Sequence, residues 1–306
     1  MAFPSYDLSR FAADPSSARE VDAICRDTGF LVLTGHGVAP QVIDDVWTAA
    51  AAFFAQDPAT KAQVRAPYPG YPYGWLGPDS EALAKSKGMD TPPDLKESFN
   101  GGPLWVPLDA PADALKFCYQ PTLWPDLPGF QDAWTAYYAA METLAARIMQ
   151  VFAVALGRDA DFFAPFIGNP ISALRALHYP ATGAAAQKDQ QRAGAHTDYG
   201  SLTILLPQPD RRGLQVQIAG DWVDVPTPPG AFVINIGDLM ALWTNDRWVS
   251  TLHRVVAIPD QPARQSLAFF HQPDWDAEIA PLDSTIRERM VRSGPYLMNK
   301  FKATGT

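Results

Sequence analysis

A histidine and an aspartate stand two positions apart in the segment GAHTDYG, which spans residues 194–200. The apolar run at 201–206 follows at once and favours a strand. Side chains alternate along extended backbone, so His196 and Asp198 point to the same side while Thr197 points away. We therefore expect this pair to reach one metal ion together.

A third ligand is expected far along the chain, on a strand that the fold brings alongside. His253, in the segment STLHRVV at 250–256, is the best candidate. Two histidines and one carboxylate on one face of an iron ion leave the opposite positions open, as non-heme Fe(II) oxygenases require for substrate-side ligands and O2. The sequence thus predicts that His196, Asp198 and His253 are metal-binding, catalytic residues.

Arg264 and Ser266 form a second candidate group, beginning eleven residues after His253. A hairpin between His253 and Arg264 would bring this pair near the metal, with both side chains on one face. The arginine fork pairs with a carboxylate through two hydrogen bonds, and the serine adds a hydroxyl. A 2-oxo acid could bind the metal at one end and Arg264 at the other, with Tyr179 supplying a further hydrogen bond.

The candidate substrate residues are less sharply defined by the sequence. Arg175 shares a strand face with Tyr179, so it could pair with a carboxylate of the substrate, or form a structural ion pair instead. Four apolar residues are candidate pocket walls, although most such side chains are plain core: Phe99, Leu239, Trp243 and Phe270.

Hydrophobic periodicity divides the chain into helical and strand-rich parts. Helices are expected at 15–28, 38–56, 130–156 and 282–292, and residues 64–128 should be irregular and cover a pocket. Short strands separated by Pro, Gly and Asp indicate a sandwich or barrel, so the fold class is mainly β with flanking helices. The strands are expected at 30–33, 174–179, 201–206, 214–218, 222–225, 232–236, 251–257 and 266–270.

No flexible linker is visible, so residues 1–306 are interpreted as a single catalytic unit. Within it, 1–170 would be a mostly helical N-terminal region, 171–275 the β core, and 276–306 a C-terminal helix and tail.

Composition narrows the classes of partner. The net charge is −9 and no Lys/Arg-rich run occurs, which argues against a nucleic-acid partner. No stretch approaches the roughly 18 apolar residues of a membrane span. Two cysteines form no disulfide framework and favour a reducing cytoplasm. We expect a small-molecule substrate, with a monomer as the simplest assembly.

Further short motifs occur in a consistent order along nearly the whole chain. They are TGFLVLTGHGV at 28–38, GY at 70–71, DLKESF at 94–99, HTD at 196–198, GDL at 237–239, WTN at 243–245, STLHRV at 250–255 and RQS at 264–266. In order and spacing they resemble the isopenicillin N synthase-like family of Fe(II)/2-oxoglutarate-dependent dioxygenases.

This resemblance implies a double-stranded β-helix, or jelly-roll, core. It implies that His196, Asp198 and His253 bind Fe(II), and that Arg264 and Ser266 hold the distal carboxylate of the cosubstrate 2-oxoglutarate, with Tyr179 beside them. The implied reaction uses O2 to oxidise a C–H bond of a small metabolite and releases succinate and CO2. Hydroxylation is the expected outcome, and desaturation, cyclisation or ethylene formation stay open.

Two rival functions remain at this stage. One is an iron oxidase that takes its electrons from the substrate and needs no 2-oxoglutarate. The other is a cupin-like metal-binding barrel without redox chemistry, which would have no need of the acid receptor at Arg264 and Ser266. The sequence does not identify the substrate.

Overall fold

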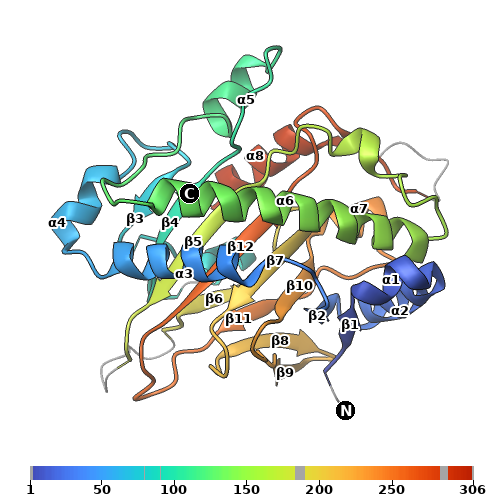
Figure 1. Cartoon of the computed structure of the whole chain (residues 1–306), viewed down its shortest axis with the longest axis horizontal. Coiled ribbons are helices and arrows are strands. Elements are labelled where there is room, and N and C mark those ends of the chain that lie inside the picture. Colours follow the sequence, from blue (N-terminus) through green and yellow to red (C-terminus); the bar gives the residue numbers. More distant parts are fainter. Residues whose placement is uncertain (1–2, 79, 90, 183–189, 283–288, 305–306) are drawn as a thin grey trace.

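The computed structural model describes residues 3–78, 80–89, 91–182, 190–282 and 289–304. Two β-sheets face one another, and a layer of helices covers the outer face of the larger sheet (Figure 1). This arrangement is the expected one, with a β core and flanking helices.

The larger sheet has eight strands in the order β1-β2-β10-β7-β12-β5-β4-β3. Only β1 and β2 run parallel, and every other neighbouring pair is antiparallel. The strand bounds are β1 (Ser5–Asp7), β2 (Phe30–Thr34), β3 (Gly74–Leu76), β4 (Glu97–Gly101), β5 (Ala173–Tyr179), β7 (Leu202–Pro207), β10 (Phe232–Ile236) and β12 (Arg264–His271).

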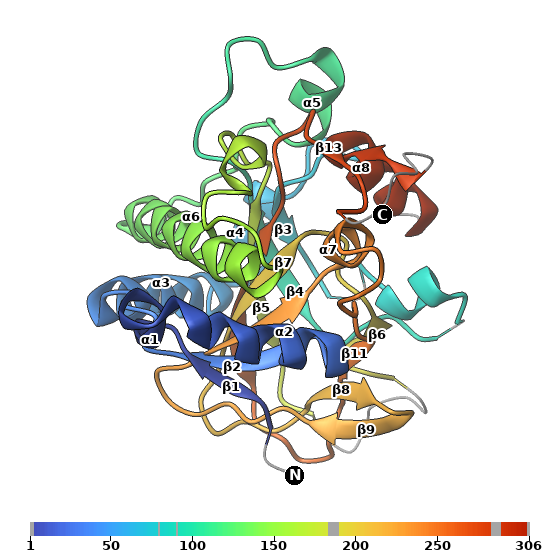
Figure 2. The same cartoon turned by 90° about the vertical axis from the view of Figure 1, so that its right-hand side faces the viewer.

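The smaller sheet has four antiparallel strands in the order β6-β11-β8-β9. They are β6 (Ala193–His196), β11 (His253–Val255), β8 (Leu214–Ile218) and β9 (Asp221–Asp224). A separate pair is formed by β13 (Glu278–Ile279) and β14 (Val291–Arg292). Seen from the side, the smaller sheet and the helices α3 and α6 lie on opposite sides of the larger sheet (Figure 2).

The helices are mostly amphipathic. The longest, α6, is Phe130–Ala155, and it buries Trp134, Tyr137, Met141, Leu144 and Ile148 along one side, at helical spacing. The others are α1 (Ser9–Ala13), α2 (Ala18–Asp27), α3 (Pro40–Phe54), α4 (Pro58–Lys61), α5 (Ala112–Phe117), α7 (Asp238–Trp243) and α8 (Ser293–Thr304). Short 3-10 turns include η3 (Leu83–Lys87).

Alternation along the strands gives the larger sheet two different faces. Leu31, Ile234 and Phe269 face the helices and join the main apolar core, where each fully buried side chain contributes roughly 1.5–3 kcal/mol. Phe30, Val233 and other residues of the opposite parity pack toward the smaller sheet, with Val216 and Val255. The space between the two sheets is therefore where side chains of both can meet.

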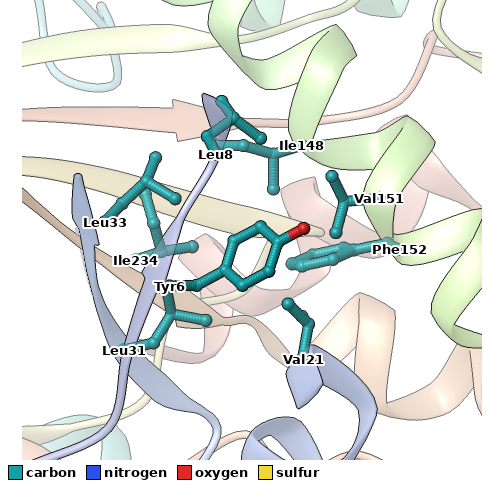
Figure 3. A pocket seen from close by; sticks show the side chains of 9 residues that line it. All are labelled: Tyr6, Leu8, Val21, Leu31, Leu33, Ile148, Val151, Phe152 and Ile234. Carbon is teal, nitrogen blue, oxygen red and sulfur yellow. The ribbon is translucent and has the colours of Figure 1, made fainter. Parts of the chain in front are cut away.

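A small hollow on the helical side of the larger sheet is lined by apolar side chains and Tyr6. It lies between β1, β2 and β10 on one side and α2 and α6 on the other, and the Tyr6 ring lies in the middle of the side chains that line it (Figure 3). The Tyr6 hydroxyl is within 2.8 Å of the Ser17 hydroxyl. The other lining residues are apolar and the Tyr6 hydroxyl is already paired with Ser17, so the hollow belongs to the packing of the fold.

Three expectations about local structure are wrong in detail. Residues 64–128 contain β3 and β4, which complete the larger sheet. The strand of His196 ends at that residue, so Asp198 lies beyond it. His253 and Arg264 are in different sheets, because β11 pairs with β6 and β8 while β12 pairs with β5 and β7. They are not joined as a hairpin.

The helix expected at 282–292 cannot be compared over most of its length, and the last described helix follows it in the chain. Residues 291–292 are in strand β14, and the helix is α8, Ser293–Thr304. Most of the expected span 282–292 lies outside the described residues. Among those that are described, no helix is long and apolar enough to cross a lipid bilayer.

Candidate metal and cosubstrate site

Three ligand atoms converge at the edge of the smaller sheet. His196 ends β6 and His253 begins β11, and these two residues are direct partners in the strand pairing. Each of the two Nε2 atoms lies 3.8 Å from Asp198 Oδ1. Atoms at this separation can both lie about 2.2 Å from one ion, which is an ordinary metal–ligand distance. The three residues are the one such His/Cys/Asp/Glu cluster in the described part of the chain.

Both histidines are oriented by backbone carbonyls. His196 Nδ1 is 2.7 Å from the Gly194 carbonyl oxygen, and His253 Nδ1 is 3.1 Å from the Thr251 carbonyl oxygen. A carbonyl only accepts, so each Nδ1 carries the proton and each Nε2 presents its lone pair. This is the arrangement expected of imidazoles that bind a metal.

Asp198 is held by two donors on the larger sheet. The Thr203 hydroxyl donates to Asp198 Oδ2 at 2.5 Å, and the Asn235 amide donates to the same oxygen at 2.7 Å. Thr203 and Asn235 are partners in the β7–β10 pairing. Because Oδ2 is occupied by these bonds, Oδ1 is left facing the two imidazoles.

The protonation states suit metal binding at neutral pH. Burial, together with the charge of His253, lowers the pKa of His196 to about 3. Burial alone would raise the pKa of Asp198, but the nearby His253 and His196 and the bonds from Asn235 and Thr203 hold it below its ordinary value. The histidine is therefore neutral and the carboxyl ionised, which are the forms that bind cations.

The other histidines of the chain have different partners. His36 Nε2 contacts the Gly230 carbonyl oxygen at 3.0 Å, and His178 Nδ1 contacts Glu97 at 2.9 Å. His271 Nδ1 contacts the Ser201 hydroxyl at 2.7 Å, and burial lowers its pKa to about 4. None of these three belongs to the cluster around Asp198.

The candidate acid receptor lies on the larger sheet. Arg264 and Ser266 alternate along β12 opposite Tyr179 and Leu177 of β5, so they share the face that points toward the smaller sheet. The Arg264 guanidinium lies over the Tyr179 ring, 4.8 Å from its centroid. All three side chains are buried, and burial lowers the pKa of Arg264.

Two buried polar atoms of this candidate receptor make no hydrogen bond with the described residues. Arg264 Nε and Ser266 Oγ are buried with no hydrogen-bond partner, and Arg264 pairs with no carboxylate of the described residues. Its Nη1 makes one long bond, 3.4 Å, to the Arg212 carbonyl oxygen. An unpaired buried guanidinium is costly, and a ligand carboxylate would satisfy it.

Arg175 lies on the same face but already has partners. Its Nη1 is 3.1 Å from Glu81 Oε1, and its Nε donates to Asn100 Oδ1 at 2.5 Å. Glu81 is also paired with the buried Lys96, at 3.2 Å. The structure therefore gives Arg175 the ion pair that was the alternative to a substrate contact.

Three of the four expected pocket walls are core residues instead. Phe99 is completely buried on the helical face of β4, where its ring contacts Phe53, Phe130 and Trp134. Leu239 and Trp243 are buried in the same core, and Trp243 packs against Phe163 and Phe166. The structure thus gives these three side chains a place in the main apolar core. Phe270 packs with the inner cluster of Tyr179 and Val255.

Part of the irregular region approaches the strand of His196. The turn η3 lies so close to β6 that a Cβ on Gly194 would meet the Ala84 backbone nitrogen at 2.8 Å. Asp94 Oδ1 accepts from the Gly194 amide at 2.9 Å, and Lys87 donates to the Thr197 hydroxyl at 2.8 Å. These contacts place η3 and Asp94 beside the iron-ligand candidates.

Thr203 and Asn235 were not foreseen from the sequence. The available signal was a polar residue inside an apolar strand, since Asn235 interrupts the run FVINI of β10 and Thr203 interrupts LTILL of β7. A buried polar side chain needs a partner. The sequence alone could not name Asp198 as that partner.

Two imidazoles and one carboxylate inside a jelly-roll, together with a buried arginine that pairs with no carboxylate of the described residues, are typical of non-heme iron oxygenases that use an acidic cosubstrate. Comparisons with known proteins agree. Residues 170–273 match the 2OG-Fe(II) oxygenase superfamily, and residues 3–127 match the family described as non-haem dioxygenase in morphine synthesis N-terminal. The chain belongs to the 2OG-Fe(II) oxygenase superfamily.

Individual relatives support the same assignment. The chain is 36% identical to the 2-oxoglutarate-dependent dioxygenase citB of Monascus ruber, over 92% of this chain and 87% of that protein. It is 33% identical to the validamycin A dioxygenase of Streptomyces hygroscopicus subsp. limoneus, over 92% of this chain and 80% of that protein.

A solved structure is also similar. A full-length Neurospora crassa protein, solved in complex with alpha-KG, superposes with a TM-score of 0.85 at 30% identity, covering 99% of this chain and 96% of that one. The present protein is thus a 2-oxoglutarate-dependent dioxygenase with a jelly-roll core, and its cofactors are Fe(II) and 2-oxoglutarate.

Proposed function

We propose that His196 Nε2, Asp198 Oδ1 and His253 Nε2 bind the Fe(II), and that Arg264 and Ser266, beside Tyr179, bind the distal carboxylate of 2-oxoglutarate. The convergence of the three ligand atoms supports the first part. The second part rests on the buried Arg264, which has no carboxylate partner among the described residues.

The donor set suits the metal. Two neutral imidazoles and one carboxylate form the facial triad that non-heme Fe(II) oxygenases use. Bound iron supplies the activation of O2, which is coupled to decarboxylation of the 2-oxo acid. The protein's own part is to hold the reactants: Asn235 and Thr203 fix the carboxylate, Gly194 and Thr251 fix the imidazoles, and Arg264 fixes the far end of the cosubstrate.

The reaction that we propose is hydroxylation of a C–H bond in a small metabolite. One oxygen atom of O2 enters the substrate, and the other enters succinate as 2-oxoglutarate loses CO2. Desaturation or cyclisation would instead remove two hydrogen atoms from the substrate, so product mass separates the outcomes. The similar Neurospora crassa protein was also solved with alpha-KG and thymine together, which supports a small-molecule substrate here.

We further propose that the protein works as a monomer in a reducing cytoplasm, without nucleic-acid or membrane partners. Cys25 and Cys118 are both buried free thiols, and burial raises their pKa, so neither is poised to form a disulfide. This fits a protein that needs no oxidising compartment.

The test is succinate release from 2-oxoglutarate under O2, scored across a panel of small metabolites for stimulation by substrate. We expect Arg264→Ala to raise the KM for 2-oxoglutarate about 100-fold, because truncating one partner of a buried charge pair is that costly. Arg147→Met is the matched control, since Arg147 lies on α6 and donates to the His36 carbonyl oxygen at 2.6 Å. Equal KM values in the wild type and Arg264→Ala would refute the cosubstrate assignment.

A further inference from the structure

A second buried arginine lies next to the acid receptor. Arg192 immediately precedes β6 and is completely buried. Its Nη2 donates to the carbonyl oxygens of Pro180 and Pro262, both at 2.9 Å, and its Nη1 donates to Gln261 Oε1 at 2.9 Å. Its Nε has no hydrogen-bond partner among the residues that the structure describes.

These bonds join the ends of three strands that carry site residues. Pro180 follows Tyr179 at the end of β5, and Pro262 lies two residues before Arg264 at the start of β12. Arg192 itself lies four residues before His196. One guanidinium therefore fixes the relative positions of the strand ends around the cosubstrate receptor.

A chain of hydrogen bonds also links Arg192 to Arg264. Gln261, which accepts from Arg192, donates through Nε2 to the Arg212 carbonyl oxygen at 2.7 Å. Arg264 Nη1 contacts the same carbonyl oxygen at 3.4 Å. Movement of Arg192 would thus be passed to the Arg264 fork through Gln261.

The two arginines also share an unbalanced charge. No carboxylate of the described residues pairs with either one. Burial, and next the charge of Arg264, lower the pKa of Arg192 to about 10, so its guanidinium remains charged at neutral pH. Arginine side chains stay protonated in proteins, so Arg264 is charged as well. Two like charges in a buried region favour an anion between or beside them, and a dianion more than a monoanion.

We propose that Arg192 is a positioning residue of the cosubstrate site, which aligns Arg264 through Gln261 and makes the pocket selective for dicarboxylic over monocarboxylic 2-oxo acids. This inference rests on the proposed role of Arg264 as receptor of the distal carboxylate. Arg192 acts through the residues to which it is hydrogen-bonded and through the electrostatic field of its positive charge, so it need not contact the cosubstrate.

The experiment measures binding without turnover. Fe(II)-loaded protein is titrated under anaerobic conditions with 2-oxoglutarate and, separately, with 2-oxobutyrate, which lacks the distal carboxylate. For Arg192→Met we expect the Kd for 2-oxoglutarate to rise about ten-fold and the Kd for 2-oxobutyrate to stay unchanged. For Arg192→Lys, which keeps the charge but not the fork, we expect a rise of about three-fold.

A purely structural role would give a different pattern. It would lower the melting temperature, and it would raise the Kd values for the two 2-oxo acids by the same factor or leave both unchanged. An unchanged ratio of the two Kd values would overturn the inference. If Arg192→Met does not fold, Gln261→Met replaces it, because this variant breaks the link between the two arginines without removing a charge. A raised Kd for 2-oxoglutarate alone supports the proposal. An unchanged ratio of the Kd values for 2-oxoglutarate and 2-oxobutyrate opposes it.

Two further variants separate this inference from the proposed function. If Arg264→Ala leaves the Kd for 2-oxoglutarate unchanged, the assignment of the receptor itself fails. If Arg264→Ala weakens binding while Arg192→Met and Gln261→Met do not, only the role of Arg192 fails. Arg147→Met, which removes an arginine bound to a backbone carbonyl outside the barrel, should leave both Kd values unchanged.

Discussion

The Asn235 amide donates to Asp198 Oδ2 at 2.7 Å and thereby joins the larger sheet to the candidate iron ligand. Asp198 lies beyond the end of β6, so no strand pairing fixes its side chain. The carboxylate is instead oriented from across the barrel, by Asn235 of β10 and Thr203 of β7.

Removing this support should weaken metal binding. We expect Asn235→Leu, which is close in volume, to raise the Kd for Fe(II) roughly ten-fold, because partners that orient a metal ligand typically contribute 10–100-fold to affinity. Thr203→Val should have a similar effect. The Kd is measured under anaerobic conditions by competition with a chelator of known affinity.

A matched control for these variants is Ser201→Ala. Ser201 is completely buried and bonds to His271, so its loss costs stability without touching Asp198. If Ser201→Ala and Asn235→Leu shifted the Kd for Fe(II) equally, the effect would be general loosening and the specific role of Asn235 would be wrong.

Phe99 distinguishes a core role from a pocket role. Its ring is completely buried against Phe53, Phe130 and Trp134. We expect Phe99→Ala to lower the free energy of unfolding by about 3–5 kcal/mol, as for other Phe-to-Ala changes in cores. Chemical denaturation measures this loss, and the Kd for 2-oxoglutarate should be unchanged in the folded fraction. A Phe99→Ala variant that is as stable as the wild type but has an altered substrate preference would contradict the core role and favour a place in the pocket wall.

Glu81 should make stability depend on pH. Burial alone would raise the pKa of this carboxyl, but Arg175 and Lys96 outweigh it and lower the pKa from 4.5 to about 2. The stabilisation is therefore fully present above pH 4.5 and is lost as the pH falls toward 2. Its size is about 3 kcal/mol at most, from 1.36 kcal/mol per pKa unit.

The comparison is with Glu81→Gln in metal-free protein. We expect the free energy of unfolding of the wild type to fall more steeply between pH 4.5 and 2 than that of the variant, because the variant has no carboxyl to protonate there. Denaturant titrations at several pH values provide the curves. Parallel curves would contradict the lowered pKa of Glu81.

The sequence predicted the strands with clear apolar runs and the long helix α6, since those patterns are local. It did not reveal β4, because both faces of that strand are covered and the sequence shows no alternation of apolar and polar residues there. Phe99 packs under the helices, while Ser98 and Asn100 face the smaller sheet. The residue types Ser, Asn and Gly also favour loops. Pairing with β5 on one side and β3 on the other makes this segment a strand.

The candidate site was predictable in its residues and less so in its geometry. Spacing and family resemblance pointed to His196, Asp198 and His253, which the structure brings together. The hairpin expected between His253 and Arg264 does not form, because β11 and β12 belong to different sheets. Strand order is set by contacts distant in sequence, and so is the support of Asp198 by Asn235. Neither can be derived from local patterns.

The most direct test of the central claim is an anaerobic titration of metal-free protein with Fe(II) in the presence of excess 2-oxoglutarate. We predict a weak visible charge-transfer band that saturates at one Fe(II) per chain in the wild type, requires 2-oxoglutarate, and is lost in His253→Ala. A band of unchanged intensity in His253→Ala, or no band in the iron-loaded wild type, would contradict the site described for this protein.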